Sequence, residues 1–489
     1  MLVYDLEKKG DKPIYEYIYG CIRDDIRCGV LRSGDKLPSR RQMALDNGIA
    51  EITVSNAYSQ LVTEGYIESR EKKGFFVASD IEGITQSVED SETKPGHGAK
   101  RGAQSVKRAS LPAKKAAPAR KCNTESAGEM LNISTGGLPE ETFPFDTWSK
   151  LARKILSDRR SECIKAPEAR GLIQLREAIA GYLSRSRGFS PDPERIIVGP
   201  GTEYLASILL NIIGGSSIVG VEDPGYRNIS NLYEMSAHKC LHIPVDEYGL
   251  ITCGLKDLNL KMIHVSPSHH FPIGCVMCAG RRTSLINWAY SEDGWIAEDD
   301  YDSEFRFEGR PVPPLISSDP GRVIYMNTFS RTISPSIRIS YMILPEELYE
   351  KYVGKHMYQS GSVSALEQLT LASFISEGYY ERHLNRVRNL YRKRKKAIFE
   401  IAREGELSKY FECEGDGSGM TFLLHSRMPV DDRRFLSDLR SHGLILYSLE
   451  DYCYDISDFA HNRYVVNFGS VTEEQFADAA RIICDALKG

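Results

Sequence analysis

The sequence has no long hydrophobic run. Nowhere in its 489 residues do the roughly 18 to 20 consecutive apolar residues occur that a membrane-spanning helix requires. The first residues, MLVYDLEKKGDKP, mix acidic and basic side chains and contain no apolar segment typical of a secretory signal. Hydrophobic residues make up 41% and charged residues 26%, as in an ordinary globular protein. We therefore expect a soluble protein of the cytoplasm.

The sequence also lacks a cysteine framework. Eleven cysteines are an odd number and follow no regular spacing, which favours free thiols in a reducing compartment. Cys275 and Cys278 form a CxxC pair, but no second pair stands at the spacing of a zinc ribbon. His264, His269 and His270 have no cysteine or carboxylate at ligand spacing. The sequence therefore predicts ordinary packing for these residues and no metal site.

The length of the chain exceeds what a single hydrophobic core usually supports, so we expect two or more domains. Residues 80–130 are rich in Ser, Ala, Pro, Gly and charge, which is typical of a linker. Between Lys94 and Lys121 nine Lys or Arg residues occur without an acid, although the chain has a net charge of -5. This stretch would suit either a basic arm that follows a phosphate backbone or a solvated spacer. The predicted units are residues 1–79, the basic linker, and residues 131–489.

The first unit carries the patterns of three helices and a hairpin. Isoleucines recur every four residues from Ile14 to Ile26 and describe one apolar face of a first helix. Ser39 and Gln42 have the spacing of a capping box at the start of a second helix. The apolar stripe predicted for a third helix consists of Val54, Ala57, Tyr58, Leu61 and Val62, with Gln60 among the polar residues that face outward.

Two short strands are predicted after the third helix, at residues 66–70 and 74–77, with a basic tip between them. Three helices and such a hairpin make a winged helix-turn-helix, in which the third helix enters the major groove of DNA. The segments PIYEYIYGCIRDDIRCGVLRSGDKLPSRRQMA, TVSNAYSQLVTEGYIES and KKGFFV resemble the GntR family. The resemblance implies contacts to double-stranded DNA from Arg40, Arg41, Thr53, Ser55, Asn56, Lys72 and Lys73.

One position departs from this family. The GntR pattern usually has Ser-Arg just before the x-Thr-Val segment, whereas this chain has Ala50 and Glu51. Glu51 suits the positive end of a helix dipole, but it replaces a cation that would face phosphate. The departure implies weaker DNA binding or a larger contribution of the linker. A protein-interaction module remains the alternative.

From residue 131 onward, helix and strand patterns alternate over more than 350 residues, which predicts an α/β domain with a mainly parallel central sheet flanked by helices. Seven motifs occur in the order seen in fold-type I aminotransferases, from LPEETFPFDTWSKLARKIL through VEDPGYRNI and IAEDDYDSEFRF to NTFSRTISPSIRISYMILP. With the winged helix in front, the whole chain resembles the MocR/GabR group of transcription regulators. The resemblance implies a smaller C-terminal α+β subdomain and a homodimer.

The aminotransferase family binds pyridoxal 5'-phosphate, and the resemblance gives each matched residue a role. Asp299 matches the acid that keeps the pyridine nitrogen protonated. Tyr301 matches the tyrosine that hydrogen-bonds the phenolic oxygen, and Tyr226 matches the aromatic residue that stacks on the ring.

The phosphate is assigned two further contacts by the same resemblance. The turn formed by Gly201, Thr202 and Glu203 would supply backbone amides at a helix N-terminus. Arg338 would clamp the phosphate through its guanidinium group.

The Schiff-base lysine is missing from its expected place. In the family it follows the serine of a T-F-S-K motif, and here Thr328, Phe329 and Ser330 are followed by Arg331. A guanidinium group stays protonated and cannot act as the amine nucleophile or shuttle a proton. No lysine occurs between Lys261 and Lys351 to replace it. We therefore expect an inactive site that holds the cofactor non-covalently, with Thr328, Ser330 and Arg331 around it.

Other site positions differ from the family as well. The glutamine common in the PSHQ motif is His270, and the usual glutamine of the phosphate loop is Glu203. A carboxylate beside a phosphate is unfavourable unless Arg331 or Arg338 compensates for it. Asn228 stands where related regulators have an arginine for an effector carboxylate.

Three functions remain open at this stage. The first is a DNA-binding regulator whose large domain dimerises and senses pyridoxal phosphate or an amino-acid-related effector. The second is a working aminotransferase with a DNA-binding appendage, which the missing lysine argues against. The third is a purely structural dimerisation domain with an empty pocket.

Overall fold

The structure is a computed structural model. It describes residues 2–4, 6–10, 12–70, 73–78, 130–135, 137–307, 312–415, 419–456 and 458–488, apart from the side chains of Glu7 and Asp458. Of the linker expected at residues 80–130, all but Met130 lies outside these ranges, as does the expected wing-tip residue Lys72. No helix in the described ranges is long and apolar enough to cross a membrane.

The first unit has the predicted order of three helices and a two-stranded wing: α1 (Ile14–Arg27), α2 (Arg40–Asn47), α3 (Glu51–Thr63), β1 (Ile67–Arg70) and β2 (Gly74–Val77). The Ser39 hydroxyl caps α2 by accepting a hydrogen bond from the Gln42 amide at 3.2 Å. Gly48 ends α2 in the left-handed conformation. Strands β1 and β2 pair antiparallel, so the hairpin prediction is confirmed.

The helix faces follow the predicted periodicity, with three exceptions. Ile18, Ile22 and Ile26 are fully buried, whereas Ile14 at the start of the same stripe is 37% exposed. In α3 the prediction was wrong for two residues: Val62 is 36% exposed, and Gln60 is buried. The Gln60 amide donates a hydrogen bond to the Glu64 carboxylate, which explains why this polar side chain can face inward.

The large unit is built on an eight-stranded sheet in the order β4-β11-β10-β9-β8-β5-β6-β7. The strands from β10 to β6 run parallel, and β11 is antiparallel to both of its neighbours. The strands are β4 (Ile196–Gly199), β5 (Ile218–Asp223), β6 (Lys239–Asp246), β7 (Gly249–Leu250), β8 (Met262–Val265), β9 (Trp295–Asp299), β10 (Val323–Thr328) and β11 (Ser340–Ile343). The sheet is therefore mixed but mainly parallel.

Helices cover the sheet, and a second, antiparallel sheet forms the C-terminal part of the chain. The helices are α4 (Phe145–Asp158), α5 (Arg160–Cys163), α6 (Ile173–Ser186), α7 (Thr202–Ile213), α8 (Arg227–Glu234), α9 (Ala279–Ser291), α10 (Glu346–His356), α11 (Ala365–Ser376) and α12 (Tyr379–Glu404). The C-terminal part contains β12 (Phe411–Glu414), β13 (Thr421–Ser426), α13 (Asp432–Ser441), β14 (Leu444–Ile445), β15 (Tyr447–Ser448), β16 (Arg463–Asn467) and α14 (Glu473–Lys488). A short strand β3 (Leu131–Asn132) pairs with β14.

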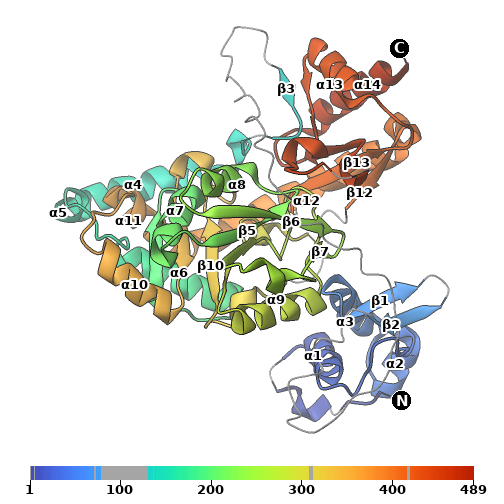
Figure 1. Cartoon of the computed structure of the whole chain (residues 1–489), viewed down its shortest axis with the longest axis horizontal. Coiled ribbons are helices and arrows are strands. Elements are labelled where there is room, and N and C mark those ends of the chain that lie inside the picture. Colours follow the sequence, from blue (N-terminus) through green and yellow to red (C-terminus); the bar gives the residue numbers. More distant parts are fainter. Residues whose placement is uncertain are drawn as a thin grey trace.

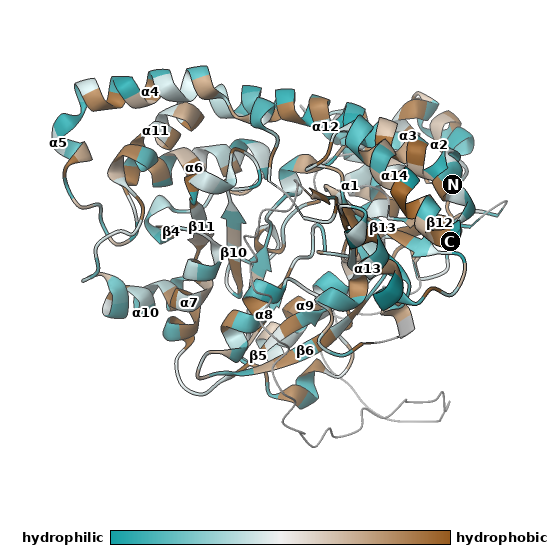
Figure 2. Cartoon of the chain, turned by 90° about the horizontal axis from the view of Figure 1, so that it is seen from above, coloured by the Kyte–Doolittle hydropathy of each residue, from teal (hydrophilic) through white to brown (hydrophobic). Residues whose placement is uncertain are grey.

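Figure 1 shows the winged helix in blue below the C-terminal part in red, with the large sheet and its helices beside them. Seen from above, the long helices α4 and α12 follow one edge of the molecule and carry both hydrophilic and hydrophobic residues (Figure 2). Buried apolar residues lie on both faces of the large sheet in two clusters. This burial is the main force that holds the strands in place.

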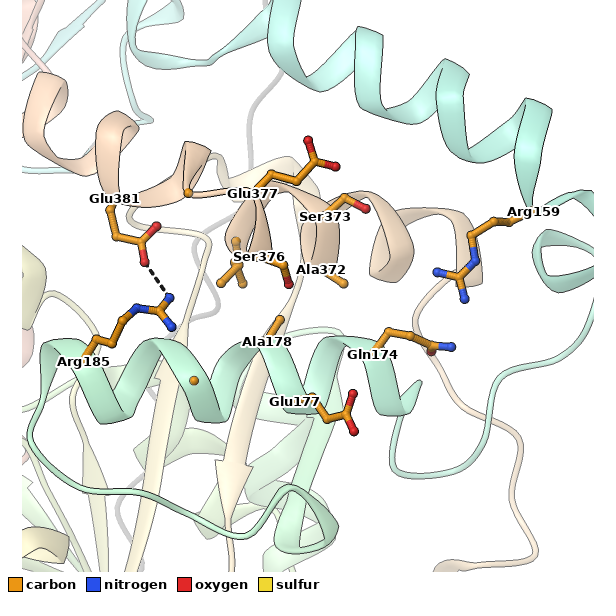
Figure 3. A pocket seen from close by; sticks show the side chains of 13 residues that line it. Arg159, Gln174, Glu177, Ala178, Arg185, Ala372, Ser373, Ser376, Glu377 and Glu381 are labelled. Atoms are coloured by element: carbon orange, nitrogen blue, oxygen red, sulfur yellow. Dashed lines mark hydrogen bonds and ion pairs between the residues drawn. The ribbon is translucent and has the colours of Figure 1, made fainter.

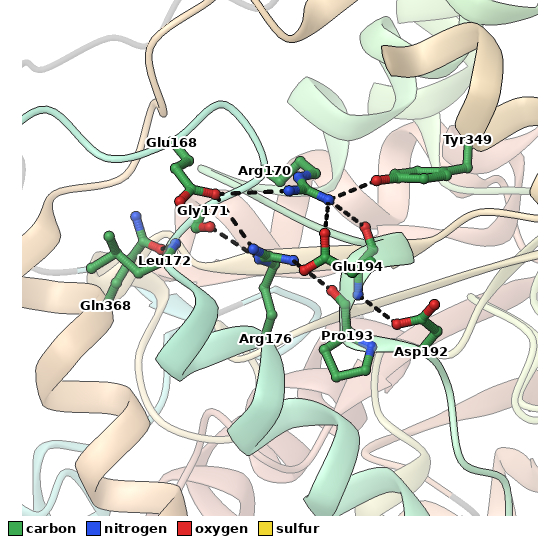
Figure 4. A network of polar contacts seen from close by, with 10 residues as sticks. All are labelled: Glu168, Arg170, Gly171, Leu172, Arg176, Asp192, Pro193, Glu194, Tyr349 and Gln368. Atoms are coloured by element: carbon green, nitrogen blue, oxygen red, sulfur yellow. Dashed lines mark hydrogen bonds and ion pairs between the residues drawn. The ribbon is translucent and has the colours of Figure 1, made fainter.

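A polar network fixes the chain segment that leads into α6 (Figure 4). Arg176 is 1% exposed and donates hydrogen bonds to the backbone oxygens of Gly171 and Pro193. Its guanidinium group also forms ion pairs with Glu168 and Glu194. Because the buried guanidinium group of Arg176 meets backbone and carboxylate acceptors, the network stabilises the edge of the sheet at β4.

A second buried ion pair lies beneath the end of β9. Arg187 donates to the Asp300 carboxylate at 2.5 Å, and both side chains are at most 3% exposed. We expect Arg187→Ala to lower the free energy of unfolding by about 3–5 kcal/mol, because it leaves a buried carboxylate without its partner. The measurement is urea denaturation of the full chain.

Arg185→Ala is the matched control. Arg185 pairs with Glu381 at 2.8 Å, but its side chain is 60% exposed, so the loss should be about 1 kcal/mol or less. Equal losses in the two variants would show that the buried pair has no special role.

Candidate ligand site at the strand ends

The candidate residues of the large unit gather where the parallel strands end. Asp299 is the last residue of β9 and Thr328 the last of β10. Gly201 directly precedes α7, and the chain reaches it from β4, which is separated from β10 by β11 in the sheet. The carboxyl ends of strands are where open α/β sheets bind ligands.

Asp299 presents an acceptor that lacks a partner. One carboxylate oxygen, Oδ2, lies 3.6 Å from Nε2 of His264, whose other ring nitrogen contacts the Tyr233 hydroxyl at 2.7 Å. The second oxygen, Oδ1, is buried and has no hydrogen-bond partner in the structure. A buried, unsatisfied carboxylate oxygen is costly, so it indicates a donor that arrives with a ligand.

The turn before α7 forms an open cradle. Gly201 has φ 121°, a conformation that favours glycine, and a Cβ atom there would lie only 2.4 Å from Nη2 of Arg338. The backbone of Arg338 is also in the left-handed conformation, with φ 51°. Its guanidinium group donates to the Pro200 carbonyl at 3.0 Å and lies 3.6 Å from the Glu203 carboxylate. Backbone amides and a cation thus meet at one helix N-terminus, as in anion sites.

Tyr226 stands at the mouth of the site and is 40% exposed. Its hydroxyl donates to Glu203 at 3.4 Å and accepts from the Asn228 amide at 3.0 Å. The ring lies edge-on to Phe271 at 6.1 Å.

Tyr301 contacts His269, the residue before the motif position His270. Its hydroxyl lies 3.0 Å from Nδ1 of His269, which also pairs with Asp302 at 2.9 Å. His270 is fully buried on the other side of this segment, 3.7 Å from Glu222. Sequence reasoning weighed His269 only as a metal ligand and did not single out Glu222. This segment is irregular, so the periodicity of the sequence offered no signal for these two contacts.

The turn after β10 carries Arg331. The Thr328 hydroxyl accepts hydrogen bonds from the Ser330 amide at 3.1 Å and from the Ser340 hydroxyl at 2.8 Å, so it holds the turn in place. The Ser330 hydroxyl is buried without a partner. The guanidinium carbon of Arg331 lies 5.9 Å from the centre of the Tyr301 ring. Within the described part of the chain, no carboxylate forms an ion pair with Arg331.

Burial shifts the pKa values of Glu222 and His270. Desolvation raises the pKa of Glu222 to about 8, although the Ser266 amide donates to its carboxylate at 3.0 Å. Desolvation lowers the pKa of His270 to about 3. Near neutral pH the pair is therefore a protonated acid beside a neutral imidazole.

A separate cavity of about 780 Å³ lies between α6 and the segment from α11 to α12, and Figure 3 shows its lining side chains. Arg185 and Glu381 form an ion pair across one end of it. None of the candidate site residues lines this cavity.

The strand-end site fits pyridoxal phosphate. Asp299 Oδ1 is an unpartnered acceptor for a ring N–H group, and Ser330 offers an unpartnered hydroxyl. The Gly201 cradle and Arg338 suit a phosphate group. No group of three or more His, Cys, Asp or Glu side chains in the described ranges is arranged to hold a metal ion.

The candidate DNA contacts lie on the outside of the winged helix. Arg40, Arg41, Asn56 and Lys73 are exposed, and Thr53 and Ser55 are half-buried. The Arg40 guanidinium donates to the Ser55 hydroxyl at 3.1 Å, which joins the starts of α2 and α3.

Comparison with known proteins agrees with this architecture. The family described as "Bacterial regulatory proteins, gntR family" matches residues 14–77, and "Aminotransferase class I and II" matches residues 129–448. Among solved structures, the multiple substrate aminotransferase from Thermococcus profundus has a TM-score of 0.67 at 22% identity and covers 74% of this chain and 92% of its own. The large unit therefore has the fold-type I aminotransferase fold.

A winged helix fused to this fold defines a class of transcription regulators. The "Uncharacterized HTH-type transcriptional regulator YdeL" of Bacillus subtilis is 34% identical over 90% of either chain. The "Probable rhizopine catabolism regulatory protein MocR" of Rhizobium meliloti is 32% identical over 87% of this chain and 84% of its own. The pyridoxine biosynthesis regulator PdxR of Corynebacterium glutamicum is 30% identical over 95% and 94%. The chain belongs to the GntR-type regulators with an aminotransferase class I and II domain, together with MocR and PdxR.

The raised pKa of Glu222 predicts a pH dependence of stability. Between about pH 5 and 8 the folded protein binds a proton at Glu222 that the unfolded chain releases, so stability falls as the pH rises through this range. Glu222→Gln should make that fall less steep by up to one proton, or about 1.4 kcal/mol per pH unit. Urea denaturation at pH 6, 7 and 8 measures it.

Glu247→Gln, at an exposed carboxylate, is the control and should keep the wild-type slope. If Glu222→Gln has the wild-type slope as well, Glu222 is ionised in the folded protein and the assignment is wrong.

Proposed function

We propose that this protein is a DNA-binding transcription regulator whose aminotransferase-like domain binds a ligand and does not catalyse transamination. The observation that carries the proposal is the half-buried guanidinium group of Arg331 in the strand-end site, which forms no ion pair with any of the residues that the structure describes. By the sequence motif, Arg331 stands at the position of the family's lysine. Because a guanidinium group cannot form the covalent bond to the cofactor, this site would bind without reacting.

The proposed ligand is pyridoxal phosphate or a derivative that includes an amino acid. Asp299 would accept a hydrogen bond from the ring nitrogen, and Arg338 with the amides after Gly201 would hold the phosphate. Tyr226 would stack on the ring, and Tyr301 would hydrogen-bond its phenolic oxygen. When bound, the group supplies an electron-withdrawing pyridinium ring. The side chain of Arg331 offers only hydrogen bonds and a fixed positive charge there.

The proposed organisation follows from the family. Residues 1–79 bind operator DNA, residues 80–130 are a basic linker, and residues 131–489 form the sensing and dimerisation domain. Two chains associate as a homodimer, which places two winged helices on repeated half-sites. The protein would act in the cytoplasm, where its DNA target is.

The cofactor proposal is tested with pyridoxal phosphate and borohydride. Wild-type protein should bind pyridoxal phosphate but acquire no covalent label on reduction, because the site contains no amine. Arg331→Lys restores the amine and should be labelled within the peptide of residues 326–340. Mass spectrometry of the peptides measures both results, and labelling of this peptide in the wild-type protein would overturn the proposal.

Asp299→Asn tests the ring contact in the same titration. We expect the affinity for pyridoxal phosphate to fall about 10- to 100-fold, because a charged hydrogen-bond acceptor is lost. Asp319→Asn, at the surface, should bind like the wild-type protein. Equal affinities in all three proteins would remove Asp299 from the site.

The DNA proposal separates backbone contacts from base contacts. Lys73→Gln should weaken binding to all duplexes alike and reduce the slope of log affinity against log salt by about 0.9, the value for one phosphate contact. Asn56→Ala should instead change the preferred sequence, because the start of α3 faces the bases. Selection of duplexes from a random library measures both. An equal loss on all sequences for both variants would contradict the assignment.

A further inference from the structure

The recognition helix of the winged helix ends against the large domain. The backbone amide of Ala279, the first residue of α9, donates a hydrogen bond to the Glu64 carbonyl at 2.9 Å, directly after α3. The Ala279 side chain is 4% exposed and belongs to the same buried cluster as Ile18, Tyr58 and Leu61 of the winged helix. The core of the first unit is thus completed by a residue of the second.

The contact depends on a glycine. Gly65 has φ +71°, and a Cβ atom there would lie 2.7 Å from Cβ of Cys278 and 3.2 Å from its Cα. Such distances are too short for real atoms. The backbone after α3 therefore approaches α9 more closely than any other residue would allow.

Both sides of the contact are fixed by their own domains. On the winged helix, the Glu64 carboxylate accepts hydrogen bonds from the Tyr19 hydroxyl at 2.5 Å and from the Gln60 amide. On the large domain, the Arg282 guanidinium group donates to the carbonyls of Pro267, Met277 and Pro313 at 2.8–3.0 Å. Because each side is fixed within its own domain, the contact determines the orientation of the winged helix relative to the large domain.

The docked arrangement leaves the DNA-facing side of the winged helix free. Asn56 in the first half of α3 and Arg40 at the start of α2 are exposed, whereas the contact involves the residues directly after the C-terminal end of α3. Docking is therefore compatible with DNA binding and fixes the direction in which α3 points.

We propose that the N-terminal end of α9 is a docking surface for the turn after α3, and that this contact sets the half-site spacing that the protein accepts. The inference rests on the proposed homodimer. With both winged helices docked, the separation of the two recognition helices is as rigid as the dimer itself. Without docking, each winged helix is joined to its large domain only through residues 79–129 of the chain. The second winged helix then binds its half-site at an effective concentration that depends only weakly on the distance between the half-sites.

The experiment compares two duplexes. The first is a duplex that the full-length wild-type protein selects from a random library, and the second carries five additional base pairs between the half-sites, about half a helical turn. Wild-type protein should bind the second duplex about 100-fold more weakly, because one docked winged helix then faces the wrong side of the DNA.

Two variants disrupt the docking surface from opposite sides. Gly65→Ala adds the clashing Cβ atom, and Ala279→Glu puts a charge into the shared cluster while remaining compatible with the start of a helix. Both should reduce the discrimination between the duplexes to about threefold or less. Gly48→Ala is the matched control, since Gly48 also ends a helix with positive φ but has open space around its Cα. It should keep the wild-type discrimination.

Amide hydrogen exchange and light scattering distinguish a failure of the docking proposal from a failure of the proposed homodimer. Exchange at the Ala279 amide should accelerate in Gly65→Ala and stay slow in Gly48→Ala. If Ala279 exchanges faster but spacing discrimination remains at the wild-type level, the proposal is overturned. If the full-length protein is monomeric by light scattering at DNA-binding concentrations, the proposed dimer fails instead.

Discussion

Three successive buried carboxylates at the end of β9 are the constraint around which this site is arranged. Glu298 accepts hydrogen bonds from the amides of Leu315 and Ile316, and Asp300 pairs with Arg187. Asp299 between them has only His264 at 3.6 Å and keeps one oxygen without a partner. A protein that buries three acids in a row must compensate each one locally, because a buried charge without a partner opposes folding. Asp299 and Asp300 both keep a buried Oδ1 without a hydrogen-bond partner among the described residues, but Asp300 has the Arg187 guanidinium group beside it, whereas Asp299 has a histidine 3.6 Å away.

The positive groups of the site have different neighbours. Arg338 lies beside Glu203 and the Pro200 carbonyl, so its charge is already partly compensated. Arg331 has an aromatic ring as its neighbour and forms no ion pair with an acid of the described residues. The Glu203 carboxylate, which departs from the family pattern, thus faces Arg338 and not Arg331. A bound phosphate would compete with Glu203 for Arg338. An anion that binds Arg331 would not have to displace a carboxylate from it.

The elements of the winged helix were predictable because they depend on local rules. Isoleucines four residues apart, a serine cap and turn glycines predict α1, α2 and their ends without reference to distant residues. The failures came at positions where the apolar or polar type of the residue does not decide which way it faces. Gln60 can face inward because Glu64 accepts its hydrogen bond, and Val62 is 36% exposed although it falls on the predicted apolar stripe.

The same distinction holds for the strand-end site. Motif order predicted that Asp299, Tyr301, Gly201 and Arg338 would meet, since parallel strands bring their ends to one edge. It did not reveal that His269 contacts Tyr301, or that Glu222 is buried beside His270. Those contacts depend on which side of a loop each residue faces, and periodicity does not report this in an irregular segment.

The segment between β8 and α9 has a neighbour at each end. Near its start His269 contacts Tyr301 in the site, and at its end Cys278 lies against Gly65 of the winged helix. If this segment couples ligand binding to operator binding, the coupling free energy is the same for both, because linkage between two binding equilibria is symmetric. A ligand that strengthens operator binding by some factor would itself be held more tightly by the same factor once the operator is occupied. The promoter would then act as an effector of the pocket.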